Sequence, residues 1–171
     1  CKIDKIKWIR ILYSYPETIT DKLIQVIKEN NKICNYFDIP IQHISDSVLK
    51  RMNRKSNGES IRKLIQKLRK EIPNVILRTT VMVGFPGETY EDFKETLSLI
   101  REVEFTSLFT FIYSPRVGTP AAKMDDPIPA EEKSKWFQEL LAVQEEIAGK
   151  RCASMVGKKE KILVESVNKK N

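Results

Sequence analysis

The sequence predicts an α/β fold whose parallel strands form an open or partial barrel. Short β-rich runs alternate with longer segments of helical period along most of the chain. The run at 75–83, V-I-L-R-T-T-V-M-V, is almost continuously apolar, as expected of a strand in a buried parallel sheet. Strand–helix alternation is the βα repeat of such a sheet. Four βα units are too few to close a (β/α)8 barrel, so we expect an open one.

The first half of the chain supplies two of the expected strands, at 6–13 and at 34–41, the second closing at Pro40. Thr20 is placed to cap a helix whose inner face carries Leu23, Ile24 and Ile27. A short helix is expected at 46–52. An amphipathic helix then follows, because its apolar residues recur at helical spacing: Ile61, Leu64, Ile65, Leu68 and Ile72.

The second half repeats the pattern after the strand at 75–83. Thr89, with Asp92 three residues later, predicts a capped helix start. A fourth strand is expected at 107–113, and Pro129 opens a long helix with Trp136 on its inner side. A further strand is expected at 161–167.

Composition restricts the class of protein. The chain has 171 residues, 41% of them hydrophobic and 31% charged, which is typical of a folded domain. No apolar run approaches the length that crosses a bilayer, and the first residues carry no signal-peptide pattern, so a cytoplasmic protein is expected. Cys1, Cys34 and Cys152 are isolated in the sequence, so no metal site is predicted within this chain.

The net charge of +7 is unevenly distributed. Nine Lys or Arg residues face one acid, Glu59, between Lys50 and Lys70, and a second basic stretch runs from Lys150 to Lys170. Two interpretations stay open: solvated helix faces, or a surface for RNA.

The loops expected after the strands contain the residues best suited to bind a ligand or take part in chemistry. In parallel α/β folds these loops meet at one rim, where ligands bind. The expected loops are the segments 40–46, 84–89 and 113–120; the first contains the single histidine and the second contains two of the six glycines. Gly84 and Gly87 either make a tight turn or let a ligand approach the backbone. Ser45, His43 and Asp46 are too close in sequence to form a catalytic triad, and Arg116 is either a surface residue or an anion clamp.

Four blocks in the chain resemble the radical S-adenosylmethionine (SAM) methylthiotransferases. They cover nearly the whole sequence in the family's order: W-I-R-I-L-Y-S-Y-P at 8–16, F-D-I-P-I-Q-H at 37–43, L-R-T-T-V-M-V-G-F-P-G-E-T at 77–89 and Y-S-P-R-V-G-T-P-A-A at 113–122. The family has a branch that modifies an aspartate of a small-subunit ribosomal protein (RimO-like) and a branch that modifies a tRNA adenosine (MiaB-like). D-I-P-I-Q-H-I-S-D at 38–46 and L-R-T-T at 77–80 look like the ribosomal-protein branch.

The resemblance implies a partial barrel that binds SAM across its open rim. It also implies two [4Fe–4S] clusters in a full-length parent, one chelating SAM and one presenting sulfur. By position, Gln42 and His43 match a loop near the SAM ribose, and the segment from Gly84 through Glu88 matches a loop around the adenosyl group. Arg78 and Thr80 match positions toward the methionine end, and Tyr113 and Ser114 match the border of the adenine. The implied SAM-binding residues are Gln42, His43, Arg78, Thr80, Gly84, Phe85, Pro86, Gly87, Glu88, Tyr113 and Ser114.

The cluster-binding cysteines of the family are absent from this sequence, so no residue here is predicted to be catalytic and the chain alone is expected to be inactive. Residues 1–155 are expected to be the C-terminal part of the barrel, and 156–171 the start of a small β-barrel of the TRAM type. Expected partners of the parent are a ribosomal protein or the ribosome, with RNA as a further option and no membrane. A tRNA-branch fragment and a non-catalytic RNA-binding module are the alternatives. The apolar run at 6–13 is expected to favour self-association.

Overall fold

The computed structural model describes residues 3–164 and contains a three-stranded parallel sheet in the order β1-β2-β3. The strands are β1 (Tyr36–Gln42), β2 (Ile76–Val83) and β3 (Ser107–Ile112). The helices are α1 (Asp21–Glu29), α2 (Asp46–Arg51), α3 (Gly58–Glu71), α4 (Tyr90–Val103) and α5 (Ala130–Met155), with short 3-10 turns η1 (Pro16–Thr18) and η2 (Pro120–Lys123). Parallel strands connected through helices confirm the predicted partial (β/α) barrel.

Each predicted helix start inside the barrel has a chemical cause. The Thr20 side chain accepts a hydrogen bond from the Leu23 amide at the start of α1. Thr89 and Asp92 form a reciprocal capping box at the start of α4, as predicted. α5 begins after Pro129, whose fixed φ suits a helix start.

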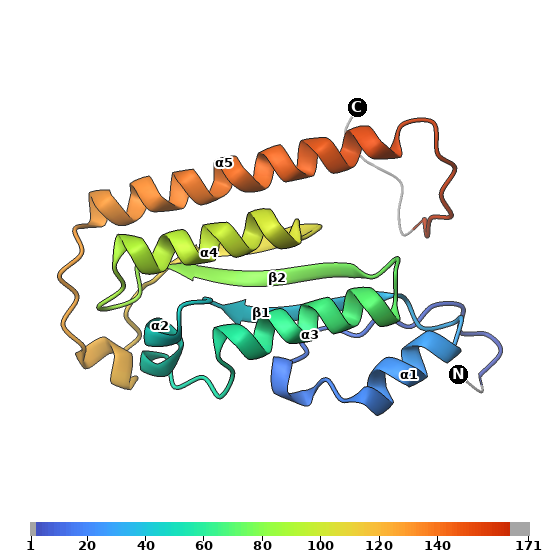
Figure 1. Cartoon of the computed structure of the whole chain (residues 1–171), viewed down its shortest axis with the longest axis horizontal. Helices are drawn as coiled ribbons and strands as arrows, with labels where there is room; N and C mark the ends of the chain where they lie inside the picture. Colours follow the sequence, from blue (N-terminus) through green and yellow to red (C-terminus); the bar gives the residue numbers. More distant parts are fainter. Residues whose placement is uncertain (1–2, 165–171) are drawn as a thin grey trace.

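The helices cover one face of the sheet and leave the other open. Leu77, Val81 and Val83 of β2 are buried in one core with the inner residues of α1, α3, α4 and α5. Figure 1 shows α5 lying along α4 beyond β2, and α3 beside β1. On the opposite face, Phe109 and Phe111 of β3 are 41% and 53% exposed. The concave inner face of the partial barrel therefore presents aromatic rings to solvent.

The prediction of a regular strand at 6–13 is wrong. This segment does run parallel to β1, but it makes a single bridge, between Ile9 and Ile33, and further along the Ser14 amide donates to the Asp38 carbonyl at 2.8 Å. Tyr13 adopts φ +57°, which interrupts an extended chain, and Trp8 and Leu12 are exposed. The segment is an irregular edge because it lacks a second buried face.

β1 extends past the residue at which it was predicted to close. Pro40 lies inside the strand, where the pairing with β2 shifts register between Ile39 and Gln42. Pro40 has no amide proton to donate to β2, and at this irregularity the Thr79 hydroxyl bridges the strands: it donates to the Ile39 carbonyl at 2.7 Å and accepts from the Ile41 amide at 3.4 Å. The bulge turns Gln42 to φ +69° at the strand end.

The C-terminal strand expected at 161–167 is not seen in the part that can be described. Residues 161–164 have no strand pairing, and 165–167 lie outside the described residues. The described sheet therefore has three strands, one fewer than the four predicted before this point. Among the described residues, no helix combines the length and apolar character needed to cross a membrane.

Candidate functional site

The carboxyl ends of the three strands meet at one edge of the sheet, which we call the rim. The strands end at Gln42, Val83 and Ile112, and because all three are parallel their following loops lie together. A cavity of about 490 Å³ opens there, the rim cavity. It is lined by Gln42, Thr80, Met82, Phe111, Ile112, Tyr113, Ser114, Arg116, Thr119 and Ala121.

The rim cavity combines apolar walls with a few polar groups, the usual make-up of a small-molecule site. Met82 and Phe111 are paired across β2 and β3, so their side chains share the inner face. Thr80 lies two residues earlier on the same face of β2. The Tyr113 hydroxyl is buried and has no hydrogen-bond partner among the described residues. Tyr113 lines the cavity as a residue, while its hydroxyl is shielded from solvent.

Gln42 is the residue shared by the cavities at this rim. Besides the rim cavity, it lines a neighbouring cavity of about 400 Å³ with Phe85, and one of about 220 Å³ with Tyr13 and Tyr15. Its φ of +69° is uncommon for a side-chain-bearing residue, and such backbone strain occurs often at ligand sites.

The loop after β2 is held by a buried carboxylate. Glu88 Oε2 accepts hydrogen bonds from the amides of Gly84, at 2.6 Å, and Phe85, at 2.9 Å. Its other oxygen, Oε1, lies 3.0 Å from Nε2 of His43. Both side chains are fully buried. The carboxylate thus fixes the turn from inside and joins it to the loop that follows β1.

The hydrogen bonds of His43 define its tautomer. Nδ1 accepts from the Ser45 amide at 3.0 Å and therefore carries no proton, so Nε2 carries the proton and donates it to Glu88. His43 is completely shielded from solvent. Its ring therefore supports the rim from below and does not line a cavity there. Ser45 interacts with Asp92 and not with His43 through its side chain, in keeping with the absence of a triad.

Both glycines of this loop adopt the left-handed conformation, Gly84 at φ +75° and Gly87 at φ +76°. A Cβ on Gly84 would lie 2.6 Å from Cδ of Lys133, whose buried stem crosses the turn. Lys133 is paired with Asp126. The turn geometry and the close packing of Lys133 are therefore sufficient to explain why glycine occupies position 84, and the turn geometry explains Gly87.

Asp92 connects the rim loops through its hydrogen bonds. Burial would raise the pKa of this carboxyl, but donors on Ser45, Ser47 and Thr89 outweigh burial and lower its pKa to about 2. Oδ2 accepts from the Thr89 amide at 3.0 Å, and Ser47 donates to Oδ1 at 2.7 Å. A charged Asp92 therefore ties the start of α4 to the start of α2.

Two arginines at the rim were missed as site residues. Arg51 donates to the Gly87 carbonyl at 2.7 Å, and Arg54 donates to the Pro40 carbonyl at 2.8 Å. Arg54 also lies over the Tyr15 ring, 4.9 Å from its centroid. Both line the 400 Å³ cavity. They belong to the basic stretch 50–70, and only their position at the end of the short helix α2 (Arg51) and just after it (Arg54) distinguishes them from its solvated lysines.

Arg78 lies apart from the other predicted site residues. It is early on β2, paired with Asp38 and Ser107, with its guanidinium 3.5 Å from the centroid of the Phe109 ring and 3.9 Å from Oδ2 of Asp38. It lines none of the three rim cavities. Of the predicted residues, the structure gathers Gln42, Thr80, Tyr113 and Ser114 at the rim cavity and Phe85 beside it. Gly84, Pro86, Gly87 and Glu88 form the supporting loop.

Within residues 3–164, no three side chains of the His, Cys, Asp or Glu type converge as a metal site.

Comparison with known proteins gives the family. The model of the radical SAM superfamily matches residues 1–100, more than half of the chain. The chain belongs to the radical SAM superfamily. The rim cavity therefore occupies the open edge of a radical SAM partial barrel.

Curated relatives in this superfamily resemble nearly all of the chain. It is 56% identical over 169 residues to the ribosomal protein uS12 methylthiotransferase RimO of Alkaliphilus oremlandii, covering 99% of this chain and 39% of that protein. It is 52% identical over 165 residues to the protein of the same name from Lachnoclostridium phytofermentans, covering 96% and 38%. The chain thus spans less than two fifths of the length of these relatives.

Solved structures of other proteins share the fold at low identity. Coproporphyrinogen III oxidase (HemN) of Escherichia coli matches with a TM-score of 0.67 and 22% identity, over 82% of this chain and 32% of that one. The Elp3 protein of Methanocaldococcus infernus matches with a TM-score of 0.55 and 17% identity, over 80% and 31%. These likenesses support the partial-barrel architecture alone.

Proposed function

We propose that this chain is part of a radical SAM methylthiotransferase that modifies an aspartate of ribosomal protein uS12, and that its rim cavity binds SAM. The observation that carries the proposal is the rim itself. Four positions that the family resemblance marks for SAM, Gln42, Thr80, Tyr113 and Ser114, line one cavity of about 490 Å³. The relatives named as uS12 methylthiotransferases supply the reaction and the substrate.

The residues at the rim fit the chemistry of SAM. Adenine needs flat apolar contact, which Phe111 and Met82 offer on the inner face. Ribose hydroxyls and the adenine edge need hydrogen-bond partners, which Gln42 and Ser114 offer. A carboxylate needs a cation, and Arg116 lines the cavity while Arg54 lines the neighbouring one.

The remaining predicted residues hold this surface in place. Glu88 and His43 fix the Gly84–Phe85 turn from the buried side, and Pro86 is buried within it. Gly87 offers its carbonyl to Arg51. Arg78, whose guanidinium is committed to Phe109 and Asp38, is assigned to the inner wall of the barrel below the SAM site.

When bound beside a reduced cluster, SAM supplies the radical chemistry that removes a hydrogen atom from the substrate carbon. This chain's own share is to bind and orient SAM and to exclude water from the rim. The two [4Fe–4S] clusters and their cysteines are assigned to the rest of the parent protein. The division of the chain at 155, with a TRAM-type domain beginning at 156, belongs to the same proposal, as does a cytoplasmic location.

The test has two parts. Equilibrium dialysis with labelled SAM measures binding to the full-length parent with reconstituted clusters, and Thr80→Val or Phe111→Ala weakens it. Val117→Ala is the matched control, because Val117 lies in the same loop region, fully exposed, and lines no rim cavity. Equal SAM affinity in all three variants would remove the rim cavity as the SAM site.

The second part identifies the substrate. The full-length parent is incubated with small ribosomal subunits or with tRNA, and the products are analysed by mass spectrometry. A methylthio group on an aspartate of uS12 is expected. A methylthio group on a tRNA adenosine, with uS12 unmodified, would transfer the protein to the tRNA branch, and modification of neither would favour a non-catalytic role.

A further inference from the structure

A second, larger cavity lies at the opposite end of the sheet from the rim. Its volume is about 670 Å³, and it is lined by the residues that precede and begin β2, the ends of α3, α4 and α5, and the segment after α5. We call it the amino-terminal cavity. Its lining residues are Arg69, Pro73, Asn74, Val75, Ile76, Leu77, Glu104, Thr106, Arg151, Ser154, Met155, Lys158 and Glu160. Nothing in the proposed SAM chemistry uses it.

The fold brings the two basic stretches of the sequence together at this cavity. Arg69 comes from the last turn of α3, at the end of the stretch 50–70. Arg151 and Lys158 come from the end of α5 and the segment beyond, at the start of the stretch 150–170. The two stretches are separated by residues 71–149, so their meeting is a property of the fold.

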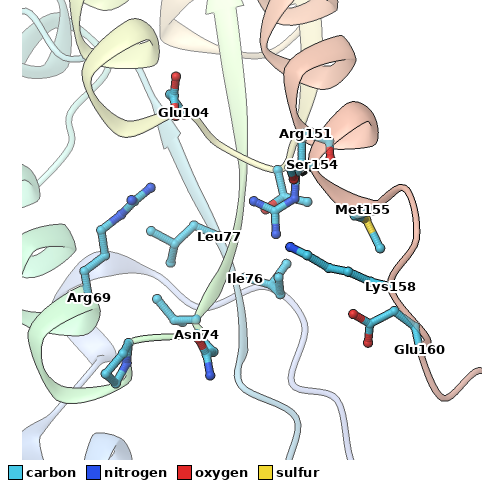
Figure 2. Close-up of a pocket in the computed structure, with 13 residues that line it drawn as sticks. Arg69, Asn74, Ile76, Leu77, Glu104, Arg151, Ser154, Met155, Lys158 and Glu160 are labelled. Carbon is cyan, nitrogen blue, oxygen red and sulfur yellow. Dashed lines mark hydrogen bonds between the residues drawn. The ribbon is translucent and has the colours of Figure 1, made fainter.

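Few carboxylates lie close enough to neutralise the positively charged side chains of the cavity. Figure 2 shows the side chains of Arg151 and Lys158 directed into the space beside Ile76 and Leu77. Within residues 3–164, neither cation has a carboxylate within ion-pairing distance. Arg69 donates to the Val103 carbonyl, a neutral acceptor.

Two acids also line the cavity. The Glu104 carboxylate is directed away from its centre (Figure 2), and it is near enough to Lys150 to contribute to the raised pKa of that lysine, which is due first to the hydrogen bond with Glu146. Glu160 is exposed at the lower edge. The centre of the cavity is therefore dominated by Arg151 and Lys158.

We propose that the amino-terminal cavity binds the phosphate backbone of RNA. Converging Arg and Lys side chains next to neutral hydrogen-bonding groups, here Asn74, Thr106 and Ser154, are the usual contacts to phosphate oxygens. Among the residues that the structure describes, no aromatic ring lines the cavity, so these residues offer no platform on which a base could stack. Binding is therefore independent of base sequence. It positions the protein on an RNA-containing particle while the rim, at the other end of the sheet, faces the reacting group.

The experiment measures binding of a short fluorescein-labelled single-stranded RNA to the 171-residue chain by fluorescence anisotropy, across a range of salt concentrations. The double variant R151Q/K158Q removes two cations from the cavity. Its affinity at low salt is expected to fall about tenfold, and the slope of log K against log salt to decrease by about 1.4, because each lost phosphate contact contributes about 0.7 for a single strand. A second RNA of unrelated sequence is expected to bind equally.

The matched control is K22Q/K135Q, which removes the same charge from exposed positions on α1 and on the amino-terminal half of α5. It is expected to change affinity less than twofold. The variant R151K/K158R keeps both charges and is expected to retain wild-type binding, which separates loss of charge from loss of folding. Equal losses in R151Q/K158Q and K22Q/K135Q would overturn the proposal, because the attraction would then come from overall charge.

A competitor identifies the class of partner. Unlabelled RNA is expected to displace the probe far better than a poly-glutamate peptide of the same charge. If the acidic peptide competes as well as RNA, the cavity recognises acidic protein segments and the RNA proposal fails. None of these measurements requires SAM, a cluster or turnover, so the proposed function and this inference can fail independently.

Discussion

Gly84 combines two constraints at one residue, a left-handed backbone and a close neighbour. Its φ is +75°, and an added Cβ would lie 2.6 Å from the Lys133 side chain. We expect Gly84→Ala to lower the free energy of unfolding by about 2 kcal/mol, part from the backbone and part from displacing a buried lysine stem. Urea unfolding followed by circular dichroism measures it.

Two other glycines separate these contributions. Gly118 also has positive φ, +86°, but has open space around it, so Gly118→Ala reports the backbone strain alone and is expected to cost about 1 kcal/mol. Gly149 lies in open space within α5, and Gly149→Ala is expected to stabilise the chain by up to about 1 kcal/mol. If Gly84→Ala costs no more than Gly118→Ala, the contact with Lys133 has no energetic weight.

Asp92 makes stability depend on pH in a defined window. Although burial opposes ionisation, hydrogen bonds from Ser45, Ser47 and Thr89 lower its pKa from 3.8 to about 2. A carboxyl whose folded pKa lies below its unfolded value stabilises the fold above the unfolded value, and the contribution disappears as pH falls to the folded value. Because solvent screens this partly exposed group, the contribution of the ionised Asp92 carboxylate to the free energy of unfolding is on the order of 1 kcal/mol.

The variant Asp92→Asn tests this window. Its unfolding free energy is expected to lie below that of the wild type at neutral pH, and the difference is expected to shrink as pH falls from 3.8 to about 2. Glu91→Gln, one residue earlier on the same helix and exposed, is the control and should show no such convergence. A difference that stays constant down to the lowest pH would assign the effect of Asp92 to helix capping through its shape alone.

At the scale of elements, the β2–α4 turn depends on the charge of Glu88. Both of its oxygens accept hydrogen bonds, Oε2 from two backbone amides and Oε1 from His43 Nε2. Glu88→Gln replaces one acceptor by a donor that faces other donors in a buried site, which we expect to cost about 2–3 kcal/mol. Amide hydrogen exchange is expected to become faster at Gly84 and Phe85 first. Unchanged exchange at these two amides would show that the turn is held by its glycines and not by the carboxylate.

The sequence predicted the elements whose local chemistry agrees with their packing. α1, α4 and α5 were predicted because apolar residues at helical spacing follow residues suited to a helix start, Thr20, Thr89 and Pro129. α3 was predicted from its apolar spacing alone, and β2 from its almost continuous apolar run. The segment 6–13 has equal apolar content, but Tyr13 takes a left-handed conformation and the segment has no covering layer. The residue pattern indicates that a segment prefers an extended conformation, but it does not show whether a neighbouring strand is available to pair with it. The wrong prediction of a regular strand at 6–13 could therefore not be recognised from the sequence.

The candidate site was predicted at the level of loops because parallel strands must bring their ends together. The separate roles within it could not be predicted. His43 and Gln42 are adjacent in sequence, yet the bulge at Pro40 turns Gln42 to the cavities and His43 to the core. Arg51 and Arg54 could not be distinguished within the basic stretch 50–70, because their contacts with the rim carbonyls depend on where α2 ends and on the turn that follows it.

At the scale of the whole molecule, the open inner face predicts self-association of the 171-residue chain. The edge segment exposes Trp8 by 41% and Leu12 by 47%, and β3 exposes Phe109 by 41% and Phe111 by 53% on the concave face. Phe109 and Phe111 line one cavity with Tyr13 and Tyr15, so several exposed aromatic side chains lie together, and a large exposed apolar patch is unusual on a monomer. A second copy offers the same aromatic surface in return, and a dimer would bury both faces.

Sedimentation velocity over a wide range of protein concentration tests this prediction, with dimer expected at the high end. Phe111→Ser is expected to shift the equilibrium toward monomer, because it replaces an exposed aromatic ring of β3 by a small polar side chain. Leu141→Ser is the matched control, since Leu141 is 37% exposed on α5, which packs on the opposite face of the sheet. If the wild type remains monomeric at every concentration, the prediction is wrong, and the exposed aromatic rings of β3 do not drive association. If Leu141→Ser has the same effect as Phe111→Ser, association proceeds through the helices and the inner face is not the contact.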